Sequence, residues 1–281
     1  MFSSLHSNPK RMFNIIDSLV SIHTDVNIII NSCGLYIKQM DSSHVCYTLL
    51  DINKDEFKEF IFDCKSNFSI TIGVNLKNLG SILNACKESN SIQLQLFDID
   101  KLYIISKTVY DTKEFSLSLI DINSEILDIP DSDYHCEFRL SSDIFNSIID
   151  SCEIMKGKDL QFNIYDKKLT ILCIGELGEY KQIFNEKEYL EKKIKIIRNE
   201  DNTKNVKNQI KKKENYSLNV SKVNFSIKYN IDMMINFKKV GKLVDIININ
   251  LKPDSPMRLD IMLNDNNGSC MQFYLAPKMD D

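Results

Sequence analysis

The stretch Arg11–Ser18 (RMFNIIDS) recurs in the second half of the chain as Asp143–Ser151 (DIFNSIIDS). In the first copy, apolar residues fall at i, i+3, i+4 and i+7, the spacing that places side chains on one face of an amphipathic helix: Met12, Ile15, Ile16 and Leu19. The same half-buried helix is therefore predicted twice, which indicates an internal duplication.

The duplication extends beyond these two helices. Each copy is followed by two strand-like runs joined by a tight turn, at Asn27–Asn31 and Leu35–Met40 in the first half and at Leu160–Tyr165 and Leu169–Ile174 in the second. Gly34 and Asp166–Lys168 mark the two turns. Further along, Asn75–Leu96 aligns without a gap onto Asn230–Leu251, and each segment shows a helical pattern that leads into a strand. The order helix, strands, helix, strands thus occurs twice.

Two such copies predict an α+β protein with two topologically equivalent domains, each with two helices packed on antiparallel sheets. A chain of 281 residues, 43% of them hydrophobic, has enough apolar side chains for two such cores. We expect the first domain at residues 1–120, an interdomain connector at 121–133 and the second domain at 134–281.

The second copy contains an insertion of roughly 20 residues, because the offset between equivalent positions grows from about 133 to 155 along the chain. It falls around residues 185–215, where Lys, Asn and Glu dominate and apolar periodicity is lost. This composition buries too little apolar surface to order itself, which predicts a mobile loop. Within the loop, Lys211–Lys213 are interpreted as a solvated charge run in preference to a nuclear-import or DNA-contact patch.

Membrane, secretory and zinc-binding classes are disfavoured. The longest apolar runs, such as Val26–Ile30, are far shorter than the roughly 20 residues that a membrane span needs. The N-terminal MFSSLHSNPKR lacks the apolar core of a secretory signal, so we expect an intracellular protein. Eight cysteines are scattered without a C-x-x-C pair or a histidine spacing that suits zinc, and we expect reduced, packed thiols and no metal site.

The titratable residues do not suggest a catalytic centre. The chain has four histidines, eight glycines and no phosphate-binding G-x-x-x-x-G-K-[ST] motif, so neither nucleotide hydrolysis nor zinc chemistry is supported. We expect a protein that is not an enzyme and needs no cofactor. A metal-dependent nuclease stays open because acidic residues are plentiful, and a magnesium-dependent nuclease assay would distinguish it. The net charge of −4 means that any DNA contact must come from a local basic surface.

Four short motifs carry a resemblance to a known family. Asp41–Val45 (DSSHV), which follows Gly34–Met40 (GLYIKQM), resembles the signature of proliferating cell nuclear antigen. Three further matches occur in the same order as in that family, at Gly73–Leu76 (GVNL), Gly175–Gly178 (GELG) and Tyr274–Lys278 (YLAPK). The resemblance covers nearly the whole chain except the insertion.

This resemblance implies the DNA-clamp (processivity) fold and a head-to-tail homotrimer that encircles double-stranded DNA without sequence preference, in the nucleus. It also implies a processivity factor for DNA polymerase and a docking platform for clamp loader, ligase, nuclease and other replication and repair proteins. Edge segments Thr108–Leu117 and Leu177–Phe184 would pair between neighbours. The alternative is a subunit of a heteromeric checkpoint-type clamp, although the intact DSSHV and YLAPK motifs favour the replicative type.

In the family, the helices line the hole and present cations to phosphates through contacts that carry no sequence information. The third helix departs from the family pattern, because Ser147 and Asp150 stand where arginines are typical, and this lowers the expected charge of the channel. The matching DNA-binding candidates in this chain are Lys10, Arg11, Lys77, Lys87, Lys238, Lys239 and Lys242.

The family also binds partner peptides in a hydrophobic pocket, which receives a short 3₁₀ turn with one aliphatic and two aromatic anchors. Backbone groups around His44 and Ala276 would bind the polar atoms of the peptide. Without the resemblance, Met40, Val45 and Leu275 would be assigned to the core. The matching positions are Met40, His44, Val45, Tyr47, Leu127, Ile129, Pro130, Pro256, Tyr274, Leu275, Ala276 and Pro277.

Overall fold

The computed structural model describes residues 1–63, 69–98, 100–123, 129, 133–186, 216–221 and 223–278. Most of the expected connector and nearly all of the expected insertion lie outside these ranges. The predictions for Leu127, Pro130 and Lys211–Lys213 therefore fall outside the described residues.

The first half of the molecule alternates strands and helices in a fixed order. It contains β1 (Phe2–His6), α1 (Pro9–Val20), β2 (Asp25–Asn31), β3 (Gly34–Met40), β4 (Cys46–Asn53), the 3₁₀ turn η1 (Lys54–Glu56), β5 (Glu59–Phe62), β6 (Ser69–Asn75), α2 (Leu76–Cys86), β7 (Ser91–Leu96), β8 (Lys101–Lys107) and β9 (Thr112–Ser118).

The second half repeats this order of strands and helices. It contains β10 (Cys136–Ser141), α3 (Ser142–Met155), β11 (Asp159–Tyr165), β12 (Lys168–Gly175), β13 (Gly178–Asn185), β14 (Tyr216–Val220), β15 (Phe225–Asn230), α4 (Ile231–Asn236), the 3₁₀ helix η2 (Phe237–Lys242), β16 (Ile246–Leu251), β17 (Met257–Asn264) and β18 (Ser269–Leu275).

The helices begin at side-chain caps and end where their sequence pattern changes. In α4 and η2, the buried apolar residues recur strictly every third position, which keeps them on one face of a 3₁₀ helix but not of a long α-helix. In the described ranges, no helix is long and apolar enough to cross a membrane. The capping residues, whose side chains accept a backbone N–H of the first turn, are Asn8, Asn75, Ser141 and Asn230.

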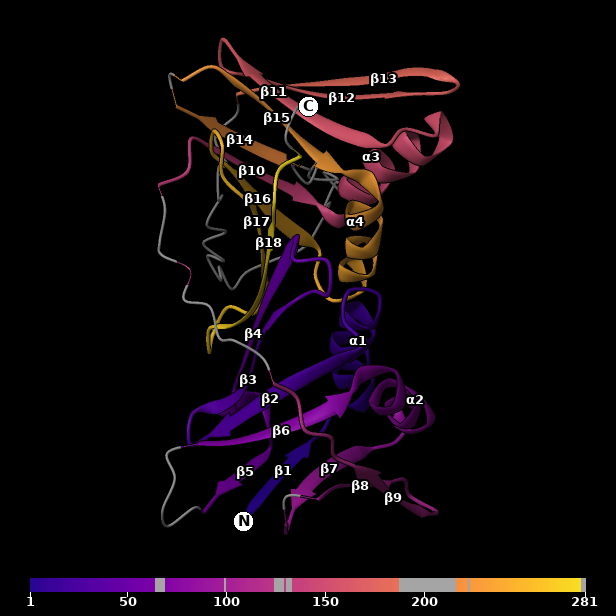
Figure 1. Cartoon of the computed structure of the whole chain (residues 1–281). Coiled ribbons are helices and arrows are strands. Elements are labelled where there is room, and N and C mark those ends of the chain that lie inside the picture. Colours follow the sequence, from indigo (N-terminus) through magenta and orange to yellow (C-terminus); the bar gives the residue numbers. More distant parts are fainter. Residues whose placement is uncertain are drawn as a thin grey trace, which may run out of the picture.

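The strands form three antiparallel sheets, and one of them runs through both halves. A five-stranded sheet has the order β5-β1-β7-β8-β9, and a four-stranded sheet has the order β13-β12-β11-β15. The nine-stranded sheet, β14-β10-β16-β17-β18-β4-β3-β2-β6, crosses from one half to the other where β18 pairs with β4, from Cys270↔Asp51 to Leu275↔Cys46. Figure 1 shows α3, α4, α1 and α2 in a row along one side of the elongated molecule.

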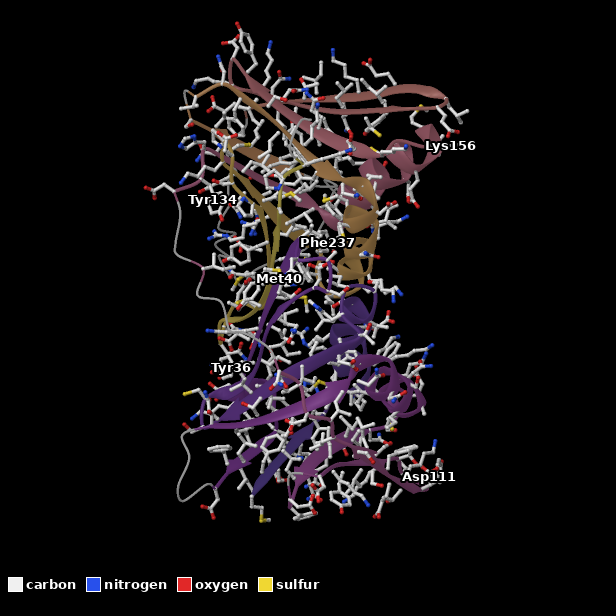
Figure 2. All side chains as sticks on the ribbon, viewed as in Figure 1. Tyr36, Met40, Asp111, Tyr134, Lys156 and Phe237 are labelled. Carbon is white, nitrogen blue, oxygen red and sulfur yellow. The ribbon has the colours of Figure 1, made fainter. Side chains whose placement is uncertain are left out.

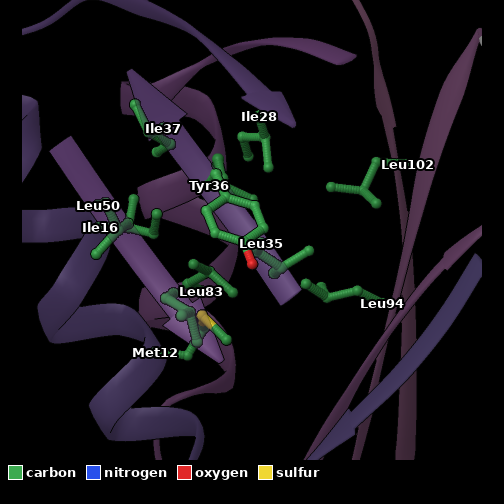
Figure 3. Close-up of a pocket in the computed structure, with 12 residues that line it drawn as sticks. Met12, Ile16, Ile28, Leu35, Tyr36, Ile37, Leu50, Leu83, Leu94 and Leu102 are labelled. Carbon is green, nitrogen blue, oxygen red and sulfur yellow. The ribbon is translucent and has the colours of Figure 1, made fainter. Parts of the chain in front are cut away.

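The buried apolar residues form one cluster that continues through both halves. At the junction, the ring of Phe237 in η2 lies 4.7 Å from the ring of Phe273 in β18. In the first half, α1 and α2 cover the strands and leave a cavity of about 40 Å³, bounded by aliphatic side chains such as Met12, Ile28 and Leu83 (Figure 3). A site with so few polar groups offers water no hydrogen-bond partners and stays dry.

The glycine of the GVNL motif has a steric reason. Gly73 in β6 accepts a hydrogen bond from the backbone N–H of Ile120, at the end of the first half (2.9 Å). A Cβ atom at Gly73 would lie 2.1 Å from the carbonyl oxygen of Ile120. Only glycine therefore allows the chain that leaves β9 to pack this closely on β6.

We expect Gly73→Ala to destabilise the protein by about 1–3 kcal/mol, because the new methyl group overlaps a backbone atom. Gly80→Ala in α2 is the matched control, since its methyl group would lie 3.6 Å from Val20 in ordinary contact. Alanine is the better helix former, so the control should gain about 0.5–1 kcal/mol. Urea unfolding of both variants measures the difference, and equal stabilities would contradict the steric argument.

Candidate functional site

The loop between β3 and β4, which carries the DSSHV motif, is organised by one carboxylate. Oδ1 of Asp41 accepts hydrogen bonds from the backbone N–H groups of Val45 (2.8 Å) and Cys46 (2.7 Å). Oδ2 accepts from the backbone N–H and the hydroxyl of Ser43. Burial alone would raise the pKa of Asp41, but these hydrogen bonds outweigh burial and keep the pKa below its ordinary value. The ionised carboxylate anchors the loop.

The anchored loop presents its tip to solvent. His44 has a φ of 58°, a left-handed conformation that few residues other than glycine adopt, and its side chain is exposed. Val45 is 37% exposed, although a valine next to a strand is normally buried. The two residues of the motif predicted to face a partner peptide thus both lie at the surface.

Three further predicted docking residues lie next to one another across three strands. Met40 of β3 pairs with Tyr47 of β4, and Tyr47 pairs with Tyr274 of β18. The two tyrosine rings are 6.4 Å apart. Tyr47 is buried, whereas Met40 and Tyr274 are half-buried, and Figure 2 shows Met40 at mid-height of the molecule, where the two halves meet.

The C-terminal YLAPK segment completes this surface. The backbone N–H of Ala276 donates to the carbonyl of Val45 (2.8 Å), so this donor, which was expected to bind a peptide, is already used within the chain. Leu275 is buried, as expected of a core residue, while Pro277 is half-buried. Pro256, which precedes β17, is exposed, and so is Ile129 of the expected connector.

Behind the loop lies a histidine that stays neutral. His23 is 4% exposed, and its Nε2 lies 2.7 Å from Oγ1 of Thr48 in β4. Burial lowers the pKa of His23 from 6.5 to about 4, although the charge of Asp41 acts in the opposite direction. His23 is thus an uncharged partner of the β4 strand and a poor candidate for a general base at neutral pH.

The second candidate surface is the solvent side of the helix row. Lys10 of α1 and Lys77 of α2 are exposed and form no ion pair with any described residue. Lys87, at the C-terminal cap of α2, lies with its Nζ 5.4 Å from the centre of the Phe13 ring. The remaining lysine candidates, which all lie in η2 and all form ion pairs with carboxylates, are Lys238, Lys239 and Lys242.

Arg11 points to the junction between the halves. Its guanidinium donates to the carbonyl of Leu263 in β17 and lies 3.6 Å from Oε1 of Glu56, whose side chain is only 10% exposed. Arg11 thus bridges α1 to the second half and is not grouped with Lys10 and Lys77.

Six strands end the three sheets among the described residues, and two of these end strands, β9 and β13, matter here. β9 is the last strand of the five-stranded sheet, and β13 is the last strand of the four-stranded sheet. Figure 1 places them at opposite ends of the molecule. Large apolar side chains are exposed nearby, with Tyr110 of the turn before β9 97% exposed and Leu177 before β13 65% exposed. Such edges invite pairing with another chain.

Two observations on the described residues concern metal binding and thiol reactivity. The described residues contain no group of three or more His, Cys, Asp or Glu side chains that could hold a metal ion. Burial raises the pKa of Cys46 and of Cys136 to about 12, so neither thiol ionises near neutral pH.

Comparison with known proteins shows which proteins this chain resembles. A family model for "Proliferating cell nuclear antigen, N-terminal domain" matches residues 2–126. Proliferating cell nuclear antigen of Chaetomium thermophilum is 27% identical over 271 residues, which span 95% of this chain and 94% of that protein. The DNA polymerase sliding clamp of Methanothermobacter thermautotrophicus is 22% identical over 280 residues, or 100% and 99% of the two chains. The resemblance to proliferating cell nuclear antigen is confirmed.

The three-dimensional comparison supports the same fold. The crystal structure of Proliferating Cellular Nuclear Antigen from Entamoeba histolytica aligns with a TM-score of 0.80 and 21% identity, and it covers 99% of each chain. The predicted α+β clamp fold is confirmed. The proposed domain boundaries at 120/121 and 133/134 stay a prediction.

Sequence reasoning did not find several residues that shape the two surfaces of this relative of proliferating cell nuclear antigen. Asp41 lies inside a recognised motif, but its role as loop anchor emerges only from its hydrogen bonds. Asp17 and Glu153 look like ordinary acidic residues of helix faces, and their lysine partners lie 222 and 85 residues away. No local signal in the sequence marks such pairs.

We expect the free energy of unfolding to fall as the pH is lowered from 6.5 to 4. Over this range unfolded His23 takes up a proton and folded His23 does not, so the loss reaches about 3 kcal/mol. His23→Gln should flatten this dependence, leaving a smaller slope from His6, whose pKa burial also lowers. Chemical unfolding at several pH values measures the slopes. Equal slopes in the two proteins would contradict the assignment to His23.

Proposed function

We propose that three copies of this chain close head to tail into a sliding clamp around duplex DNA. The ring would act as a processivity factor for DNA polymerase and as a docking platform for clamp loader, ligase, nuclease and other replication and repair proteins. The names of the relatives, which include a DNA polymerase sliding clamp, support this role. The eukaryotic relatives support the nucleus as the place of action. The chain would serve as a scaffold and not as an enzyme.

The observation that carries the proposal is the way in which the halves are joined. By position in the repeated order, β9 is equivalent to β18, and β13 is equivalent to β4. Because β18 and β4 pair within the chain, β9 of one copy and β13 of the next are expected to pair in the same manner. Each junction would satisfy two open edges, and a contact between unlike surfaces closes a ring when the rotation is right.

The internal ladder also supplies a register for this contact. Equivalent positions in the two halves can be read from the strand pairings. Phe115 is equivalent to Phe273, as the pairings β7·β8 and β8·β9 in the first half and β16·β17 and β17·β18 in the second show. Thr48 is equivalent to Tyr180 by the pairings β3·β4 and β12·β13. Phe273 pairs with Thr48 within the chain, so Phe115 would pair with Tyr180 of the neighbouring copy. One residue further, the exposed Glu114 would lie opposite an exposed lysine, Lys181, of that copy. Opposite charges on facing strand residues favour pairing.

The two surfaces would then have separate roles. The helix row would line the hole, where cations and polar groups meet phosphates without reading bases. On the sheet side, the DSSHV loop, the row from Met40 to Tyr274 and the C-terminal segment would receive peptides with a few hydrophobic and aromatic anchors.

We expect a solution mass near three times the 32.6 kDa of one chain by light scattering at micromolar concentration. Glu114→Lys and Lys181→Glu should each shift the protein toward monomer, because like charges would face each other across the edge. The variant with both changes should recover the trimer. Glu59→Lys on β5, at the opposite edge of the same sheet, is the matched control and should remain trimeric. A monomeric wild type would contradict self-closure and indicate a heteromeric clamp.

We expect Asp41→Asn to weaken binding of a peptide with an aliphatic and two aromatic anchors. The amide oxygen can still accept hydrogen bonds on one side, but on the other side the NH₂ group would face donors of the loop. The loop would then leave its exposed conformation. The loss of a charged acceptor should also cost about 1–3 kcal/mol of stability. Calorimetric titration of folded, trimeric protein measures the affinity. Unchanged affinity would show that the peptide does not use this loop, and Asp51→Asn is the control elsewhere on β4.

A further inference from the structure

The lysine at the centre of the second-half helix surface is already occupied. Nζ of Lys238 in η2 lies 2.5 Å from Oδ1 of Asp150 and 2.8 Å from Oε2 of Glu153, both in α3. These hydrogen bonds raise the pKa of Lys238, so it stays charged while its charge is balanced by two carboxylates. Lys238 takes the position that Leu83 holds in the aligned helix α2, where the side chain is buried.

The other two lysines of η2 are bound across the junction between the halves. Nζ of Lys239 lies 3.0 Å from Oδ1 of Asp17 and 3.2 Å from the backbone carbonyl of the same residue in α1. Nζ of Lys242 lies 3.9 Å from Oδ2 of Asp17. A cation in the last turn of a helix also interacts favourably with the helix dipole. Lys239 therefore connects η2 to the C-terminal turn of α1.

The two helix pairs differ in their charge balance. With the cap residue Lys156 included, the helices α3, α4 and η2 contain four lysines and four carboxylates, and the carboxylates are Asp143, Asp150, Glu153 and Asp232. By contrast, α1 and α2 with the cap residue Lys87 contain four cations and the single carboxylate Asp17. Asp17 is itself neutralised by lysines of the second half. The excess positive charge thus lies on the first-half helices.

We infer that duplex DNA contacts the helix row through the first-half lysines Lys10, Lys77 and Lys87, and that Asp150 and Glu153 keep Lys238 out of phosphate contact. This inference rests on the proposed clamp function. Around a closed ring, three basic sectors would then alternate with three neutral ones.

The physical reason is competition for one ammonium group. A phosphate that approaches Lys238 also approaches two carboxylates within about 3 Å of that nitrogen, and their repulsion offsets the attraction of the lysine. Each surface ion pair contributes only about 0.2–1 kcal/mol, so exchange of partners remains possible but brings little gain. Lys10 and Lys77 have no such competitor among the described residues, and a phosphate gains their full interaction.

The test is the salt dependence of binding to a fluorescently labelled 30-base-pair duplex, measured by anisotropy with full-length trimeric protein. Lys10→Ala with Lys77→Ala should weaken binding several-fold at low salt. The two changes should also reduce the slope of log K against log salt by about 0.9 for each phosphate that the protein no longer neutralises. Lys238→Ala should leave affinity within twofold of the wild type.

The decisive step is a double-mutant cycle on the cluster. Asp150→Asn with Glu153→Gln should strengthen binding and steepen the salt dependence, because Lys238 is then free to reach a phosphate. Adding Lys238→Ala to these two changes should remove most of the gain. Asp143→Asn with Asp232→Asn is the matched control: it removes the same amount of charge from α3 and α4 at positions not paired with Lys238, and its gain should not depend on Lys238.

The outcomes separate the inference from the function on which it rests. If trimeric protein binds DNA and Lys238→Ala alone weakens binding as much as the Lys10 and Lys77 changes, the inference is wrong and the clamp function stands. The inference is equally wrong, and the clamp function again stands, if both carboxylate pairs give equal gains that do not depend on Lys238. If no variant binds DNA, wild type included, both the inference and the proposed function are overturned.

Discussion

The backbone ladder between β18 and β4 is the interaction on which the rest of the structure depends. Each half has two sheets, and an unpaired edge strand leaves rows of N–H and C=O groups without partners inside the molecule. The ladder removes two of these edges by joining β18 of the second half to β4 of the first, which produces one sheet through the whole molecule. The equivalent edges, β9 and β13, can be satisfied in this way only by another chain.

The same junction also sets the helix row. Because the long sheet fixes the two halves, η2 meets the C-terminal end of α1, and Lys239 and Lys242 reach Asp17. On the other side of the contact, Arg11 reaches the carbonyl of Leu263 and Phe237 packs on Phe273. Arg11, Lys239 and Lys242, which the sequence assigns to DNA contact, therefore also hold the helices in line. The position of the helix row and its charge pattern depend on the same contacts.

The sequence predicts the repeated local structure well, because that information is local. Apolar spacing predicts where the helices begin and which face they bury, and the strict interval of three from Ile231 to Val240 accounts for the 3₁₀ turn of η2. The DSSHV loop was singled out through its motif, and its role in docking stays a prediction. Pairs such as Arg11 with Leu263 could not be predicted, because they depend on how distant segments meet. Nor could the burial of Leu275 beside the exposed Val45, because it depends on which side of β4 and β18 is covered.

A sliding protein has to hold DNA while leaving no position along it much more favourable than the next. A row of helices with many free lysines would hold the DNA phosphates strongly. Each step of the protein along the DNA would then cost free energy, because several charge-assisted contacts would break together. In this chain, the lysines of η2 already have carboxylate partners within 4 Å, which are Asp150 and Glu153 of α3 and Asp17 of α1. A phosphate that passes these lysines gains little from them, because they stay paired with their carboxylates, so the energy of the moving complex changes little along this part of the helix row. A topologically closed ring tolerates such weak contacts because the DNA is retained by the ring itself and not by affinity.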